Sequence, residues 1–308
     1  MRQDTDRPIV LVTRKTRLEE LIVRYNTLEQ VRFYITHMGG DFADYEAEHA
    51  CYREAVTKAQ RTLEGLGHLQ VVDRSFVPNF IFAPQAVVVA VGQDGLVANT
   101  LKYLDGQPLI GVNPDPGRWD GILLPFRTET LARLLPAVLA GQRPWREVTL
   151  AEVRLNDGQV LYGVNDLFIG QRTHVSARYE IALGTQREQQ SSSGIIVSTG
   201  LGSTGWLRSI VTGAAAIAGT APAEAMVHGA AWDAEQLWYT VREPFPSRTT
   251  GTSLVFGTIR GDAVLRLRSL MPENGVIFSD GMENDFLTFN AGAEATIRLA
   301  KKKGYLVV

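Results

Sequence analysis

Cysteine is almost absent from this chain of 308 residues, since Cys51 is the only one. No disulfide can form within the chain, and we expect a reducing compartment. The neighbours of Cys51 have a helical pattern, so we interpret it as an inert, partly buried thiol rather than a nucleophile. Histidine is also scarce: the five present have no spacing typical of a metal site, so we expect no metal ion held by the protein alone.

The sequence has no excess of charge of either sign. Lys and Arg number 31 against 33 Asp and Glu, which gives a net charge of −2. A protein that binds nucleic acid usually carries a basic patch or stripe. The only basic run, Lys301–Lys303, is interpreted as a short solvated patch. We therefore expect no nucleic-acid partner.

Long apolar runs are missing as well. The first ten residues are polar and do not resemble a signal peptide. Segment 210–232 is rich in Ala and Gly and has no Lys or Arg, but Pro222, Glu224 and several Gly argue against a membrane span. The sequence thus predicts a soluble, cytoplasmic protein without a membrane partner.

The first half of the chain alternates short apolar runs with helical patterns. Hydrophobic residues make up 45% of the chain, which is ample for a packed core. The alternation predicts an open parallel α/β sheet. The expected strands are 8–13, 69–72, 86–91 and 108–112. The expected helices are 15–37, 44–66, 96–104 and 130–140. We expect a kink or break at Pro136 and a domain boundary after Gly141.

The second half has a different pattern of short, alternating segments separated by Gly, Pro, Asp or Asn, which predicts a mostly β domain. Its expected strands are 147–155, 164–169, 177–183, 194–199, 236–241, 252–257, 263–270, 275–281 and 294–300. The Ala-rich segment 207–220 is expected to be a helix. The sequence therefore predicts an α/β domain, 1–142, and a mostly β domain, 143–308, whose last segment could pack back on the first.

Two turns of small residues follow apolar strands. The first is Gly92–Gly95, with the sequence GQDG, and the second is Ser198–Trp206, with the sequence STGLGSTGW. Small residues let backbone N–H groups approach phosphate, and ligands of parallel α/β sheets bind where strands end. Because Gly-x-Asp-Gly is also a common surface turn, the first motif alone leaves both interpretations open.

Part of the second turn has the pattern of a dinucleotide fingerprint. Residues 200–205 match G-x-G-x-x-G, and Glu224 follows at a suitable distance. That fingerprint should open a βαβ unit, whereas hairpin-like segments follow here. An NAD-dependent dehydrogenase is therefore a minor alternative. The pair Asn165-Asp166, taken alone, reads as an ordinary turn.

Taken in order, these motifs resemble those of the NAD kinase family. Its members have a GGDG turn after a strand, an Asn-Glu pair, an STPTGSTAY-like loop and a late Asp-Gly. The corresponding stretches here are Gly92–Gly95, Asn165-Asp166, Ser198–Trp206 and Asp280-Gly281. The chain looks most like the divergent mitochondrial-type branch, with which it shares GVNPDP at 111–116, LFIG at 167–170, SSG at 192–194 and VREP at 241–244.

The resemblance implies an NAD kinase-like fold, in which an open parallel α/β domain precedes a mostly β domain, and a phosphotransferase reaction. The implied reaction transfers a phosphoryl group from ATP, or from polyphosphate, to the adenosine ribose 2′-hydroxyl of NAD, with Mg²⁺ carried by the donor phosphates. Asp94 would be the catalytic base, and Gly92, Gln93 and Gly95 would bind the donor. The NAD-binding residues would be Asn165, Asp166, Ser193, Thr204, Gly205 and Trp206. A homodimer or larger homo-oligomer is also implied.

The sequence departs from the family pattern at several positions. Gln93 replaces the second Gly of GGDG, and Leu96 replaces the Thr that usually follows. Ser193 replaces an acidic residue of the family pattern. Gly200-Leu201 replaces Pro-Thr, and Gly205-Trp206 replaces Ala-Tyr. The Gln93 side chain would either obstruct the phosphates or donate a hydrogen bond to them. A relative that phosphorylates another nucleoside or sugar, or a dinucleotide-binding sensor with weak catalysis, is therefore an alternative.

Overall fold

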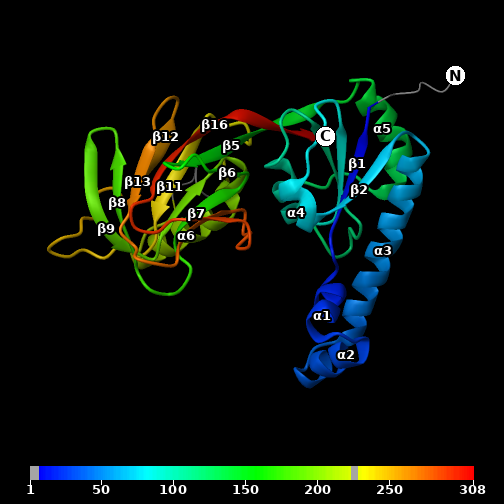
Figure 1. Ribbon diagram of the computed structural model, residues 1–308, viewed down its shortest axis with the longest axis horizontal. Coiled ribbons are helices and arrows are strands. Elements are labelled where there is room, and N and C mark those ends of the chain that lie inside the picture. Colours follow the sequence, from blue (N-terminus) through cyan, green and yellow to red (C-terminus); the bar gives the residue numbers. More distant parts are fainter. Residues whose placement is uncertain (1–6, 223–227) are drawn as a thin grey trace. The chain divides into compact units, whose positions relative to one another are not determined.

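The computed structural model describes residues 7–222 and 228–308, so Glu224 and the first six residues lie outside the described chain (Figure 1). The chain forms two compact units. Unit 1 comprises the residues up to Trp145 together with Tyr305–Val308, and unit 2 comprises Arg146–Gly304.

Unit 1 is built on a parallel sheet in the order β2-β1-β3-β4. These strands are β1 (Ile9–Thr13), β2 (Leu69–Asp73), β3 (Val87–Val91) and β4 (Pro108–Val112). The end of β16 (Glu294–Val307) lies parallel to β4, where Tyr305 and Leu306 pair with Pro108 and Leu109. All five residues of β3 are buried, which explains its unbroken run of Val and Ala.

The helices of unit 1 are α1 (Arg17–Tyr25), α2 (Leu28–His37), α3 (Phe42–Glu64), α4 (Asp94–Leu101) and α5 (Leu131–Leu139), with short 3-10 turns η1 (Arg74–Asn79) and η2 (Thr128–Thr130). The segment 15–37 is helical as expected, but it consists of two helices rather than one. Asn26 adopts a left-handed φ of 68° and ends α1, and the Thr27 side chain then accepts the Gln30 N–H to begin α2.

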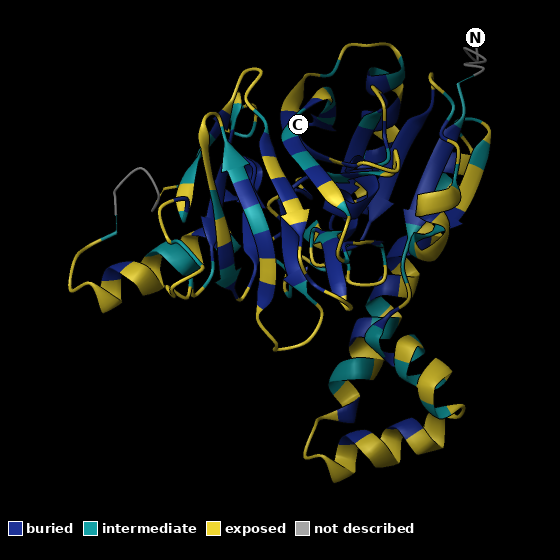
Figure 2. Ribbon diagram, turned by 60° about the vertical axis from the view of Figure 1, so that its left-hand side comes forward, coloured by how far each residue is buried: buried dark blue, intermediate teal, exposed yellow. Residues whose placement is uncertain are grey.

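The first two helices pack on the N-terminal part of α3, away from the parallel sheet (Figures 1 and 2). Leu18, Val31, Ile35 and Phe42 form a small core of their own there. Of the kink or break expected at Pro136, the break is wrong, because helix α5 continues through this residue. The proline removes one helical hydrogen bond, but the buried Leu135 and Val138 on either side hold the helix against the sheet.

Unit 2 is a sandwich of two largely antiparallel sheets. One sheet has the order β12-β11-β10-β7-β14-β15, and the other contains β16, β13, β8, β9, β5 and β6. The strands are β5 (Trp145–Leu155), β6 (Val160–Gly163), β7 (Asp166–Gln171), β8 (Ala177–Leu183), β9 (Gln186–Ser192), β10 (Ile195–Ser198), β11 (Gln236–Val241), β12 (Phe256–Arg260), β13 (Leu265–Ser269), β14 (Gly275–Ser279) and β15 (Phe286–Thr288). Residues of both sheets share one hydrophobic core, which explains the alternation of the sequence.

A short turn, η3 (Leu201–Thr204), and helix α6 (Trp206–Ile217) follow β10. Trp206 and Ile210 pack on Phe168 and Ile196, on the face of β7 and β10 that points away from the sandwich core. Within the described part of the chain, no helix is both long and apolar enough to cross a bilayer.

Three local expectations for unit 2 need correction. Strands β6, β9 and β15 were not expected, and the strand expected over 252–257 lies at 256–260 instead. The Glu188 carboxylate accepts the N–H groups of Ser253 and Leu254, which takes these residues out of strand pairing. The basic run Lys301–Lys303 lies within β16, where the Lys303 ammonium donates to the Thr149 hydroxyl (2.8 Å), so it is not simply a solvated patch.

Candidate functional site

The GQDG turn joins β3 to α4 at the carboxyl edge of the parallel sheet. The Gly92 N–H donates to the carbonyl oxygen of Val112, at the end of the neighbouring strand β4 (3.1 Å). Gln93 is the N-cap of α4, and its carbonyl oxygen accepts the N–H groups of Leu96 and Val97. Asp94 therefore lies in the first turn of α4, where N–H groups have no intrahelical acceptor and negative charge is stabilised.

The Asp94 carboxylate is half-buried and fixed by the loop after β4. Its Oδ1 accepts the backbone N–H of Leu123 at 2.7 Å. That loop approaches the sheet closely at Gly111, where a Cβ atom would stand 1.9 Å from the Leu123 carbonyl oxygen. Gly111 thus allows the approach that positions the N–H donor to Asp94.

The other residues of the turn differ in exposure. A Cβ atom at Gly92 would lie 2.8 Å from Cδ2 of Leu96, so this glycine has a packing role. Gly95 is exposed, with no atom within 4 Å of where its Cβ would be, so its backbone is open to a ligand. Gln93 is half-buried and its side chain caps no N–H of α4. The Gly92–Gly95 turn therefore presents backbone and one amide side chain at a helix N-terminus.

A cation lies at the same edge. The Tyr52 hydroxyl accepts the backbone N–H of Arg14, just after β1, and donates to the Val91 carbonyl oxygen at the end of β3 (2.8 and 3.1 Å). Burial raises the pKa of Tyr52 to about 12, so the hydroxyl stays neutral. The Arg14 guanidinium pairs with Glu48 at 3.1 Å, and both side chains are largely buried. Tyr52 thus ties the end of β1 to the end of β3, and Glu48 holds the Arg14 guanidinium, which lies 4.8 Å from the centroid of the Tyr52 ring.

In unit 2 the late Asp-Gly contacts the Asn-Asp pair. Asp280, with a left-handed φ of 55°, follows β14 and directs its carboxylate at the turn before β7. Its oxygens accept the N–H groups of Val164 (3.0 Å) and Asn165 (2.6 Å), and that of Asp166 at 3.4 Å. Three N–H donors on one carboxylate favour its ionised form.

The glycine loop packs on the same turn. Thr199 donates its hydroxyl to the Val164 carbonyl oxygen (2.6 Å) and its N–H to that of Asn165 (2.9 Å). A Cβ atom at Gly202 would stand 1.9 Å from the same Asn165 oxygen. Ser198, at the end of β10, is the register partner of Asp166. The structure therefore brings three separate motifs together: Asn165-Asp166, the loop after β10, and Asp280.

The two acids of this cluster have different environments. Asp166 is 8% exposed, and burial, with a smaller contribution from the Asp280 charge, raises its pKa to about 7. Asn165 beside it is half-buried. A side chain that titrates near neutral pH in a polar cluster is typical of a functional site.

Packing explains one departure from the family pattern. A Cβ atom at Gly200, where the family has Pro, would stand 1.9 Å from the carbonyl oxygen of Ala231. The Ser203 hydroxyl links these two segments, because it donates to the Gly200 carbonyl oxygen (2.6 Å) and accepts the Ala230 N–H (2.8 Å). Thr204 and Gly205, which follow, are exposed.

Trp206 and Ser193 lie outside this cluster, on helix α6 and in the bend before β10. Trp206 opens α6 and stacks on Phe168, with ring centroids 5.8 Å apart and planes within 6°. The Arg242 guanidinium lies 5.3 Å from the Trp206 ring centroid. Ser193 is exposed, and its N–H donates to the Arg242 carbonyl oxygen. Because Ser193 precedes β10 and Ser198 ends it, Ser193 is not brought beside Asp166 but lies at the opposite end of the strand.

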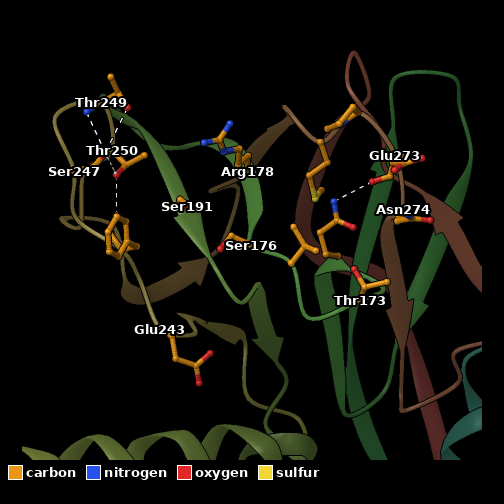
Figure 3. A pocket seen from close by; sticks show the side chains of 15 residues that line it. Thr173, Ser176, Arg178, Ser191, Glu243, Ser247, Thr249, Thr250, Glu273 and Asn274 are labelled. Atoms are coloured by element: carbon orange, nitrogen blue, oxygen red, sulfur yellow. Dashed lines mark hydrogen bonds between the residues drawn. The ribbon is translucent and has the colours of Figure 1, made fainter.

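Sequence reasoning missed two features of unit 2. One is the contact between the Asp280 carboxylate and the backbone N–H of Asn165. The Asp-Gly pair after an apolar strand was the only feature of the sequence that pointed to a role for Asp280. The other is a cavity of about 820 Å³ at the Gln171 end of β7 (Figure 3). Ser247, Thr249 and Thr250 lie on one side of it, and Glu273 and Asn274 on the other. These loop residues match no motif, so the sequence offered no signal for the cavity.

The predicted residues divide between the units. Gly92, Gln93, Asp94 and Gly95 belong to unit 1, and the predicted NAD-binding residues belong to unit 2. Cys51 lies on α3, half-buried, and burial raises the pKa of its thiol, which disfavours a nucleophilic role. Among the described residues, no cluster of three or more His, Cys, Asp or Glu could hold a metal ion.

Comparison with known proteins shows the fold. No family model matches the sequence, and no curated protein matches it. Among solved structures, the chain is similar to an NAD kinase from Archaeoglobus fulgidus, solved in complex with ATP. The identity is 16%, with 97% of this chain and 93% of that chain covered and a TM-score of 0.57.

The chain is also similar to yeast NADH kinase, solved in complex with NADH. The identity is 15%, with 98% of this chain and 84% of that chain covered and a TM-score of 0.56. The predicted architecture, an α/β domain with a parallel sheet followed by a mostly β domain, is confirmed, and it is the fold of NAD kinases.

Proposed function

We propose that this protein is a phosphotransferase that moves a phosphoryl group from ATP or polyphosphate to the adenosine ribose 2′-hydroxyl of NAD, giving NADP. The observation that carries the proposal is the contact in unit 2 between Asn165-Asp166, the loop containing Gly202, and Asp280. These segments are far apart in sequence and are three of the motifs of the NAD kinase resemblance. The ligands of the two similar structures, ATP and NADH, support nucleotide substrates.

The reaction assigns a role to each part of the GQDG turn. The ribose 2′-oxygen attacks the terminal phosphorus of the donor, the bond to the bridging oxygen breaks, and ADP or a shortened polyphosphate leaves. Asp94 accepts the hydroxyl proton, a role worth roughly 10²–10⁴-fold in rate. The open backbone at Gly95 and the N-terminus of α4 support the donor phosphates.

In unit 2, the proposed acceptor site extends along β10. Asn165 and Asp166 bind a polar part of NAD at one end of the strand, with Thr204 and Gly205 on the adjoining loop. Trp206 offers a flat apolar face to a ring, with the Arg242 guanidinium beside it. Ser193, at the other end, hydrogen-bonds an amide or hydroxyl without adding charge. The spread of these residues suits an extended dinucleotide better than a single nucleoside.

Mg²⁺ is proposed to enter with the donor. The described residues form no cluster of metal ligands, whereas donor phosphate oxygens are ligands that Mg²⁺ prefers. Bound there, the ion would neutralise the charge that develops on the transferring phosphoryl group. The protein's own contribution is the placement of the Gly92–Gly95 turn and of Asp94.

A second candidate function rests on Gln93. Its half-buried side chain stands where the family has a glycine, so the turn differs at one of the residues proposed to bind the donor. A dinucleotide-binding sensor with weak catalysis, or a kinase for another nucleoside or sugar, would fit that difference. The dehydrogenase alternative has less support, because β10 is antiparallel to both of its neighbours and opens no βαβ unit.

One experiment separates these candidates. The purified protein is incubated with Mg²⁺ and either ATP or polyphosphate, together with NAD, NADH or simple nucleosides, and products are identified by mass spectrometry. Addition of one phosphoryl group to NAD or NADH supports the proposal. Phosphorylation of a nucleoside alone, or tight NAD binding without product, supports the second candidate. A change in nicotinamide absorbance on turnover would indicate a dehydrogenase.

A further inference from the structure

Two carboxyl groups lie at the turn before β7, and only one has hydrogen-bond donors. Asp280 accepts N–H groups from Val164 and Asn165, with a longer contact from Asp166. The carboxyl of Asp166 is inside the same turn and accepts no hydrogen bond from a described residue. Ser198 is the residue of β10 that pairs with Asp166, and its hydroxyl donates to the Thr199 carbonyl oxygen instead.

Burial makes the charged form of Asp166 costly. The residue is 8% exposed, so an ionised carboxylate here keeps little of its hydration, and no described residue donates a hydrogen bond in its place. The neighbouring Asp280 adds repulsion, since it is held ionised by its own donors. Among the described residues, no cation lowers the pKa of Asp166; burial and Asp280 both raise it. The facing residues of β10 and its loop, Ser198 and Thr199, carry no charge.

We propose that Asp166 works as a neutral carboxylic acid that donates its proton in a hydrogen bond to a carbonyl, hydroxyl or ether oxygen of the dinucleotide, while Asp280 stays ionised and holds the turn. This inference rests on the proposed function, because it takes a dinucleotide as the ligand of unit 2. A carboxylic acid kept neutral by its surroundings is an established way to build a hydrogen-bond donor. The neutral form also avoids repulsion of the dinucleotide pyrophosphate.

The proposal makes ligand affinity depend on pH in a definite direction. Protonated Asp166 binds and ionised Asp166 does not, so affinity is constant at low pH and falls as the group ionises. Above the midpoint the dissociation constant for NAD should rise by about tenfold per pH unit. Asparagine has the shape of the neutral acid and keeps a donor, so Asp166→Asn should bind NAD without this dependence.

The first measurement requires no ligand. Carboxyl carbon NMR of the full chain, labelled at aspartate, gives the titration midpoint of Asp166, whose signal is identified by its absence in Asp166→Asn. The expected midpoint lies near neutral pH, well above that of an ordinary aspartate. An ordinary midpoint would overturn the inference even in a protein that binds and phosphorylates NAD.

The second measurement is NAD affinity by calorimetry from about pH 5 to about pH 9, for the wild type, Asp166→Asn and Asp166→Ala. Asp166→Asn should match the low-pH affinity of the wild type at every pH, and Asp166→Ala should bind about tenfold more weakly. The control is Asp157→Asn, an exposed acid in the β5–β6 turn of the same unit, which should behave as the wild type.

The outcomes separate this inference from the proposed function. Equal loss of affinity in Asp166→Asn and Asp166→Ala would show that the ligand needs the ionised carboxylate, and would overturn the inference. Unchanged affinity in both variants would show a purely structural acid, and would also overturn it. The expected pH pattern without phosphoryl transfer would refute the proposed function but leave the inference standing. No NAD binding at any pH would refute both.

Discussion

Gly202 lies against the carbonyl oxygen of Asn165 so closely that a Cβ atom at 202 would stand 1.9 Å from it. The loop after β10 and the turn before β7 are therefore in direct backbone contact at these two residues. A real Cβ never approaches an oxygen that closely, so a side chain at 202 must displace the loop, the turn or both. The geometry of the proposed NAD site depends on this contact.

The first prediction tests that contact. Gly202→Ala should destabilise the protein by about 1–3 kcal/mol through overpacking and should weaken NAD binding, because Asn165 is displaced. The measurements are thermal unfolding and NAD calorimetry. Gly213→Ala is the matched control: a Cβ at this exposed helical position meets no atom within 4 Å, so the variant should keep the NAD affinity of the wild type and gain up to about 1 kcal/mol of stability. Wild-type stability and affinity in Gly202→Ala would show that the contact is dispensable.

The second prediction concerns Asp94. Asp94→Asn should lower the rate of phosphoryl transfer by at least about 10²-fold, because the amide cannot accept the hydroxyl proton. Its Oδ1 can still accept the Leu123 N–H, so the fold and NAD binding should survive. Steady-state kinetics with calorimetry check this, with Asp105→Asn, an exposed acid beyond the other end of α4, as the control. Turnover unchanged by Asp94→Asn would remove this residue from the mechanism.

The third prediction concerns Gln93. We expect its amide to donate to the donor phosphates, because the side chain is half-buried at the start of α4 and caps no N–H there. Gln93→Gly should then weaken donor binding by about 1–2 kcal/mol. Its backbone φ of −119° suits any residue, so the substitution relieves no strain. A several-fold gain in NAD phosphorylation by Gln93→Gly would show instead that the side chain is an obstruction.

The fourth prediction is a dependence of stability on pH. The pKa of Asp166 is raised to about 7 in the folded protein from 3.8, so the unfolded chain ionises at lower pH than the folded one. The contribution of Asp166 to the free energy of unfolding is fully present below about pH 4 and is lost as pH rises through about 7. The loss has an upper limit of the order of 4 kcal/mol. Asp166→Asn should therefore gain thermal stability over the wild type as pH rises through this window. A difference that does not vary with pH would contradict the prediction.

The fifth prediction is the oligomeric state. We expect a homodimer or a larger closed oligomer, because the resemblance implies it and because the many strands of unit 2 have edges that need covering. One edge is already covered within the chain, where the N–H groups of Phe245 and Gly251 donate to carbonyl oxygens of β9. Light scattering across micromolar concentrations measures the state, and a monomer throughout would contradict the expectation.

Much of the fold follows from local pattern. Strand β3 is buried on both faces and is apolar throughout, whereas β8 is buried mainly on one face and alternates. Both patterns are visible in the sequence, so both strands match the prediction. Strand β9, with the sequence QREQQSS, carries no such mark. Its place depends on pairing with β8 along its whole length, which only the tertiary structure shows.

The site shows the same division. Each motif of unit 2 was visible in the sequence, but not the contact between them, because Gly202, Asn165 and Asp280 meet through long-range packing. The raised pKa of Asp166 could not be predicted either, since it depends on burial and on a second acid more than a hundred residues away. The roles of Asp94, Gln93 and the NAD-binding residues stay predictions.

The course of β16 has a consequence for synthesis of the protein on the ribosome. This strand begins in unit 2 and ends beside β4 of unit 1, where Tyr305 and Leu306 pair with Pro108 and Leu109. The other residues of unit 1 are thus translated long before Tyr305 and Leu306, and until these two residues emerge unit 1 lacks one of its strands. During that interval β4 presents unpaired N–H and C=O groups to other nascent chains. Aggregation of unfinished chains should therefore be most sensitive to the residues that line this edge.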